Sequence, residues 1–123
     1  MAGEPIEGQI LLLAAAKSSV TPTRLPDLVD VAQEHLAAER ERYRREYERL
    51  YDDGDLEAFA VETGHWAELG AELGLGDREL SAVRRAHEEQ LLRIGRRTDR
   101  EDEFETALEI RDPVVIGTGA ESG

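Results

Sequence analysis

The stretch from His65 to Arg97 constrains the fold of this chain most, because two helical segments flank a turn built on glycine. Gly74 can adopt a positive φ without a Cβ clash, which allows a helix to end sharply there. Gly70 is small enough to let a second helix cross closely over the first. We therefore predict helices over about 65–74 and 77–97 that pack together at the turn. The apolar residues that would face one another are Leu69, Leu73, Leu75, Leu80 and Val83.

This pair of helices resembles the helix-turn-helix of DNA-binding regulators, which read bases with the exposed face of the second helix. Asp77 would cap that helix through its carboxylate. The positions that correspond to the reading face are Arg78, Ser81, Ala82 and Arg85. The resemblance implies base contacts by Arg78, Ser81 and Arg85. It implies that the other arginines contact phosphates or stay solvated, namely Arg84, Arg93, Arg96 and Arg97.

The charge of the second predicted helix differs from that of the whole chain. Residues 77–97 contain six arginines and four acids, a net charge of +2, whereas the whole chain carries −13 and the remainder therefore −15. A helical projection places most of these arginines opposite the apolar stripe. A local positive excess of this kind is what a helix facing phosphates needs.

The same residues also resemble the core of death-domain-type interaction modules, which have a tryptophan, a small-residue helix and a similar turn. Here those positions are Trp66, Gly70, Leu73, Gly74, Leu75, Leu80 and Val83. The two hypotheses differ in one feature. DNA binding requires Arg78, Ser81 and Arg85 to be exposed together, whereas an interaction module implies that another helix, 26–51 or 99–110, covers them.

The composition resembles that of proteins from halophilic archaea, because the chain has 28 acidic and 15 basic residues and Lys17 is its only lysine. Carboxylates hold water and cations at high salt, and molar salt screens the self-repulsion of a charge of −13. The resemblance implies a cytoplasmic protein but no particular function. The chain has no cysteine, which excludes disulfides and thiolate metal sites.

The first half of the chain predicts two further helices. Residues 1–8 read as a flexible N-terminus, and the apolar run 10–16 is too short for a membrane span. We predict a helix over about 6–17 and a long one over 26–51, with Pro26 in its first turn. Charged pairs three or four apart would line the long helix: Glu39–Arg42, Glu41–Arg45 and Arg44–Glu48. Alternatively, its outer half pairs with a second subunit through Tyr43, Tyr47 and Tyr51.

The remaining segments complete an all-α expectation. Residues 52–54 predict a turn, followed by a short helix that carries Leu56, Phe59 and Ala60. Residues 99–110 favour a helix on capping grounds, with a strand as the alternative. Val114, Val115 and Ile116 predict an extended arm, packed on the body or waiting as an edge strand, and 117–123 a disordered tail.

No catalytic or metal motif stands out. Glu62 and His65 have the spacing of carboxylate-bridged metal bundles, but only one copy is present. His87 lies on the apolar face of its helix. We therefore predict one all-α domain over 9–116, an orthogonal bundle of four or five helices with no cofactor, metal or enzymatic activity. The predicted function is DNA binding of the helix-turn-helix type, with a protein-interaction module as the alternative.

Overall fold

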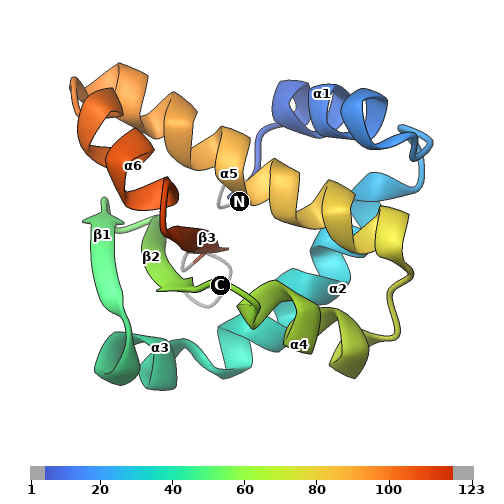
Figure 1. Cartoon of the computed structure of the whole chain (residues 1–123), viewed down its shortest axis with the longest axis horizontal. Helices are drawn as coiled ribbons and strands as arrows, with labels where there is room; N and C mark the ends of the chain where they lie inside the picture. The colour runs from blue at the N-terminus through green and yellow to red at the C-terminus, as the bar shows by residue number, and fades with distance from the viewer. Residues whose placement is uncertain (1–4, 118–123) are drawn as a thin grey trace.

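The computed structural model describes residues 5–117 and contains both helices and a sheet, so the all-α prediction is wrong (Figure 1). Six helices and three strands occur in this range. The helices are α1 (Gly8–Ser18), α2 (Leu25–Ala38), α3 (Arg40–Glu46), α4 (His65–Leu73), α5 (Asp77–Thr98) and α6 (Glu101–Leu108). The strands are β1 (Glu48–Asp52), β2 (Leu56–Glu62) and β3 (Arg111–Gly117).

The longest helix, α5, spans the molecule and organises the packing around it. It contacts α1, α2, α4, α6 and β3. In Figure 1, α1 lies along one side of α5, and α2 and the sheet lie on the other. The core therefore forms between α5 and these neighbours. No helix in the described part of the chain is long and apolar enough to cross a membrane.

The sheet is antiparallel with the order β1-β2-β3, so β2 is its central strand. The segment 55–60 is therefore not the predicted helix. All five residues from Glu57 to Val61 are buried, and a strand covered on both faces shows no alternation of apolar and polar residues. The predicted C-terminal arm is the strand β3, and it pairs with β2 from Leu56↔Gly117 to Glu62↔Arg111.

The prediction of one continuous helix over 26–51 is also wrong, although residues 40–46 within it are helical. The backbone leaves helical geometry at Glu39, resumes it in α3, and becomes extended at Tyr47, with φ −126° and ψ 157°. Tyr43 is not available to the predicted tyrosine seam, because it is only 2 % exposed and lies in the core. Of the three predicted ion pairs, Arg42–Glu39 is present at 2.7 Å, while Glu41 pairs with Arg44 and Glu48 pairs with Arg111.

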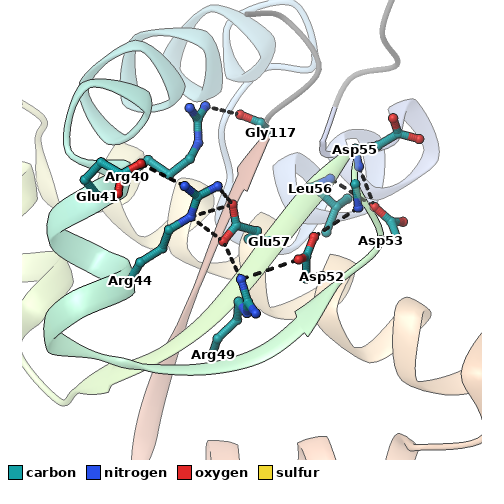
Figure 2. A network of polar contacts seen from close by, with 11 residues as sticks. Arg40, Glu41, Arg44, Arg49, Asp52, Asp53, Asp55, Leu56, Glu57 and Gly117 are labelled. Atoms are coloured by element: carbon teal, nitrogen blue, oxygen red, sulfur yellow. Dashed lines mark hydrogen bonds and ion pairs between the residues drawn. The ribbon is translucent and has the colours of Figure 1, made fainter. Parts of the chain in front are cut away.

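The buried carboxylate of Glu57 in β2 binds arginines of α3 and β1 and so connects the helix to the hairpin (Figure 2). Glu57 is 1 % exposed and accepts hydrogen bonds from Arg44 Nε at 2.9 Å and from Arg49 Nη1 at 3.3 Å. The Arg44 guanidinium holds the pKa of the Glu57 carboxyl below its usual range. Arg40 reaches past this pair and donates to the carbonyl of Gly117 at 2.8 Å. These contacts hold the end of β3 beside α3.

The turn between β1 and β2 confirms the prediction for 52–54. Gly54 has a φ of +90°, a conformation that glycine adopts without a Cβ clash. The Asp53 carboxylate accepts the backbone N–H groups of Asp55 at 2.8 Å and Leu56 at 3.0 Å (Figure 2). This is the local hydrogen bonding for which aspartate is favoured in turns.

The outer edge of β3 is satisfied by side chains rather than by another strand. Trp66 Nε1 donates to the Pro113 carbonyl at 2.8 Å, and the Val115 N–H donates to His87 Nδ1 at 2.9 Å. Gln33 Nε2 donates to the Val115 carbonyl at 2.7 Å. An edge whose backbone groups are already bonded cannot easily accept a further strand.

The chain ends agree with the sequence predictions in part. The helix prediction for 99–110 is confirmed by α6. Residues 1–4 of the predicted flexible segment 1–8 and residues 118–123 of the predicted tail 117–123 lie outside the described residues. In the described part, Ile6 is buried in the core, and the N–H of Glu7 donates to Gln90 Oε1 at 2.8 Å. Gly117 is the last residue of β3.

Two glycines in close helix contacts predict different responses to alanine. A Cβ on Gly95 would lie 2.9 Å from the Glu101 Cα, which is backbone, whereas one on Gly70 would lie 2.9 Å from a Leu80 methyl, which can rotate away. Alanine gains about 1 kcal/mol of helix propensity over glycine, and overpacking costs about 1–3 kcal/mol. We expect Gly95→Ala to destabilise by about 1–2 kcal/mol in urea unfolding and Gly70→Ala to be nearly neutral. A larger loss for Gly70→Ala would contradict this reasoning.

Candidate nucleic-acid interface

The predicted pair of helices around the glycine turn is present as α4 and α5. Gly74 has a φ of +73°, and the N–H of Leu75 donates to the carbonyl of Gly70 at 2.9 Å, which closes the end of α4. Gly70 of α4 faces the side chain of Leu80 of α5, so a side chain larger than a methyl group at position 70 would displace Leu80.

α5 begins at Asp77 as predicted, but its N-cap residue is not the predicted one. Gly76, not Asp77, occupies the N-cap position. Glu79 completes the cap, because its Oε1 accepts the N–H of Gly76 at 3.1 Å. Its Oε2 accepts a hydrogen bond from Arg24 Nη2 at 3.0 Å. The bond from the Gly76 backbone is the main cause of a lowered pKa for the Glu79 carboxyl. Glu79 also ties the segment before α2 to the first turn of α5.

One of the four positions that correspond to a DNA-reading face is buried. Ala82 has no exposed surface, because it lies on the flank of α5 that packs against its neighbours. It is therefore removed from the candidate interface. Its inclusion follows from the helix-turn-helix resemblance. On a helical projection Ala82 lies 40° from Arg78 at 100° per residue, close to the edge of the exposed strip.

Arg78, Ser81 and Arg85 lie on the outward strip of α5. Arg78 is exposed, and Ser81 and Arg85 are half-buried. The helix α6 packs near Gly95, where it meets Glu101. Gly95 is 14 residues from Ser81, or about 21 Å along the helix. The predicted covering of this face by 99–110 is therefore not what the structure has.

Most of the other arginines on α5 are held by acids. Arg93 bonds Glu7 at 3.2 Å and Gln9 at 3.0 Å, and Arg96 pairs with Glu101 at 3.2 Å. Arg97 pairs with Glu7 at 2.6 Å and Arg84 lies 3.7 Å from Glu88. The Arg97 hydrogen bond is the main reason that the pKa of Glu7 falls to about 2.

Arg78 and Arg85 form no ion pair with any residue between 5 and 117. The nearby acids on the same strip are engaged elsewhere, since Glu88 faces Arg84 and Glu89 pairs with Lys17 at 3.2 Å. The N-terminal half of the strip therefore presents two arginines whose charge is not locally neutralised. This distinction between paired and unpaired arginines could not be read from the sequence, because the partners Glu7 and Glu101 lie outside the helix.

A second polar cluster lies at the other end of α4. The hydroxyl of Tyr43 hydrogen-bonds His65 Nε2, and His65 Nδ1 is 3.7 Å from Glu62 Oε1. Burial raises the pKa of Tyr43. A cavity of about 30 Å³ adjoins this cluster, which is room for about one water molecule. His35 also lines this cavity, and its Nε2 is 3.2 Å from Glu72.

The metal motif suggested by Glu62 and His65 remains a single contact. Across residues 5–117, no three histidine or acidic side chains are placed to hold a metal ion together. The His65 ring instead packs between two tyrosines, with ring centroids 5.5 Å from Tyr43 and 5.3 Å from Tyr47. The arrangement is that of a buried aromatic cluster. The sequence did not predict it, because the contacts join the two tyrosines to a histidine about 20 residues further along the chain.

The core also departs from that of the death-domain family. That resemblance implies an all-helical core, whereas Ala58 and Phe59 of β2 and Val115 of β3 are fully buried in the core of this protein. Trp66 does serve as a core anchor, at 1 % exposure.

The fold defines a small domain of six helices and a three-stranded antiparallel sheet within the described residues, in which α4 and α5 are joined by a glycine turn. The chain belongs to the family described as Domain of unknown function (DUF8048), whose model matches residues 4–118. No curated protein and no solved structure matches the chain.

Proposed function

We propose that this protein binds duplex DNA through the α4–α5 pair, with Arg78, Ser81 and Arg85 as the contacting side chains. The observation that carries the proposal is that Arg78 and Arg85 have no ion pair within residues 5–117, while the other α5 arginines do. An unpaired guanidinium can bind a phosphate or a base edge without the loss of an ion pair to a carboxylate of the protein. The role is one of binding rather than catalysis.

The spacing of these residues suits a groove. Arg78 and Arg85 are two helical turns apart, about 10 Å along α5, which is about three base-pair steps of 3.4 Å. Ser81 lies between them on the same strip. Arginine donates in a fixed fork that matches guanine O6 and N7 or a phosphate, and serine bonds any base edge. Three side chains of these types can therefore read a short sequence.

Arg93 and Arg96 are left out of the proposed contact set. Their guanidinium groups are held by Glu7, Gln9 and Glu101, so contact with DNA would require these bonds to break. The strongly acidic remainder of the chain repels DNA in dilute buffer, and salt screens that repulsion. The halophile-like composition supports a molar-salt environment, and the proposed role places the protein in the cytoplasm with the chromosome.

The test is fluorescence anisotropy with labelled, sheared genomic DNA in about 2 M KCl, a concentration that screens the repulsion between the acidic surface and DNA. We expect saturable binding by the wild type. In Arg78→Ala/Arg85→Ala the Kd should rise at least tenfold, or about 1.4 kcal/mol, because each bidentate base contact contributes about 1–3 kcal/mol. Circular dichroism checks that both proteins are folded.

The matched control is Arg42→Ala/Arg45→Ala, which removes the same charge from α3. Both arginines are exposed, so the variant should fold and bind DNA like the wild type. Equal losses in the two double variants would show a nonspecific charge effect and contradict the assigned interface. Absence of binding by the wild type at micromolar protein would reject the proposed function.

A further inference from the structure

The helix α1 lies in the longest acid-free part of the chain. Residues 8–26 contain no aspartate or glutamate, although the chain has 28 acids in total. Of the two cations in this segment, Lys17 pairs with Glu89 and Arg24 pairs with Glu79. The surface formed by α1 is therefore close to neutral on a protein whose net charge is −13.

This helix is apolar on its outer face as well as its inner one. Leu12 is 58 % exposed and Leu13 is 41 % exposed, and Ala16, one turn further along, is also exposed. Within residues 5–117 the other large apolar side chains with this exposure are Val31 and Ile110, which stand on other elements. The inner face packs into the core through Ile10, Leu11, Ala14 and Ala15. The polar side chains on the outward side are Gln9, which accepts a hydrogen bond from Arg93, and Lys17, which pairs with Glu89. A helix that is apolar on most of its circumference is typical of one covered on both sides.

Charge decides what can cover it. Two copies of a protein with a charge of −13 repel each other, and a contact through most other surfaces would bring carboxylates together. The residues of α1 itself include no acid, and their one cation, Lys17, is paired with Glu89. A two-fold interface must also match itself, and a neutral apolar helix face does so. A basic partner would be drawn instead to the acid-rich remainder, and an anionic membrane would repel the molecule.

We propose that the outer face of α1, formed by Leu12, Leu13 and Ala16, is the interface of a homodimer. This proposal does not rest on DNA binding. Since the two copies repel through their net charge and attract through apolar side chains, added salt should tighten the dimer by screening the repulsion. A contact made by ion pairs would instead weaken.

Sedimentation equilibrium in about 0.2 M and about 2 M KCl tests this, because the Debye length falls from about 7 Å to about 2 Å over that range. We expect a monomer–dimer equilibrium with a lower Kd at the higher salt. Leu12→Gln/Leu13→Gln should raise the Kd at least tenfold at fixed salt. The matched control Val31→Gln, which removes an exposed apolar side chain from α2, should leave the Kd unchanged. A wild type that stays monomeric in both buffers, or equal effects of the two variants, would overturn the proposal.

Cross-linking gives a readout that does not depend on removing the leucines. The chain has no cysteine, so one introduced thiol reports one position. In a dimer formed through α1, Leu13→Cys should cross-link rapidly with a short bismaleimide, and Val31→Cys should not. Circular dichroism confirms that each variant is folded. Equal yields from the two positions would show random collision and reject the α1 interface.

Discussion

Replacing Trp66 by alanine should cost about 4–5 kcal/mol of folding free energy, because truncating a large buried aromatic typically costs about 3–5 kcal/mol. Trp66 is 1 % exposed, and its ring lies 4.7 Å from that of His87, centroid to centroid. Its Nε1–H also donates to the Pro113 carbonyl at 2.8 Å. The substitution therefore opens a cavity and leaves a carbonyl on the edge of β3 without its partner. Urea unfolding followed by circular dichroism measures the loss.

Trp66→Phe separates the two contributions. Phenylalanine keeps most of the apolar volume and removes the N–H donor, so we expect a loss of about 1–3 kcal/mol, the cost of an unsatisfied buried carbonyl and a smaller cavity. If Trp66→Ala and Trp66→Phe cost the same, the hydrogen bond to β3 would be the main contribution of this residue. If Trp66→Ala costs less than about 1 kcal/mol, Trp66 is not the anchor that its burial indicates.

The helices around the turn were predictable because their signals are local. Gly74 ends α4 by adopting a positive φ. Gly70 leaves room for the side chain of Leu80, which lies close to it. The predicted ranges 65–74 and 77–97 differ from α4 and α5 by one residue each. In such segments the conformation is decided by residues a few positions apart.

The sheet was missed because its signals are not local. Leu56, Phe59 and Ala60 have the spacing of a helix, and they form a strand because β1 and β3 pair on either side of β2. The sequence predicts Val114–Ile116 as extended, but it predicts a helix for the segment that forms β2, the strand with which these residues pair. The charge pattern on 39–49 suits a surface helix, yet it also supplies Arg44 and Arg49 to the buried Glu57. Long-range pairing thus overrode local spacing.

For the candidate interface, too, the sequence predicted what local spacing decides and not what contacts between distant segments decide. Spacing along one helix predicted that Arg78, Ser81 and Arg85 share a strip, and the structure places them so. It could not predict that Arg93 and Arg97 are held by Glu7, 86 and 90 residues away along the chain. Contacts between distant segments decide which arginines are available to a ligand. Only the structure shows these contacts.

Acidification from pH 7 to pH 4.5 should cost about 2.5 kcal/mol through His87 alone, because the slope approaches 1.36 kcal/mol per pH unit below the unfolded pKa. His87 is fully buried, and its Nδ1 accepts the N–H of Val115, so burial lowers the pKa of His87 to about 3. In the unfolded chain the histidine pKa is about 6.5. Between these values the unfolded state binds more protons, so stability is complete above pH 6.5 and falls as the pH drops toward 3. The stabilisation from Glu7 and Glu57, whose pKa values are also lowered, is lost mainly below pH 4.5.

His87→Asn isolates this effect, because an asparagine can still accept the Val115 N–H but does not titrate. The variant should be less stable than the wild type at pH 7, since the smaller side chain leaves a cavity beside Trp66. The difference should narrow by about 2.5 kcal/mol by pH 4.5, where the wild type bears the cost of its uncharged histidine. His35 and His65 are present in both proteins, so their contributions cancel in the comparison. Parallel stability curves from pH 7 to 4.5 would mean that His87 binds a proton equally well in the folded and unfolded states, against its complete burial between α5 and β3.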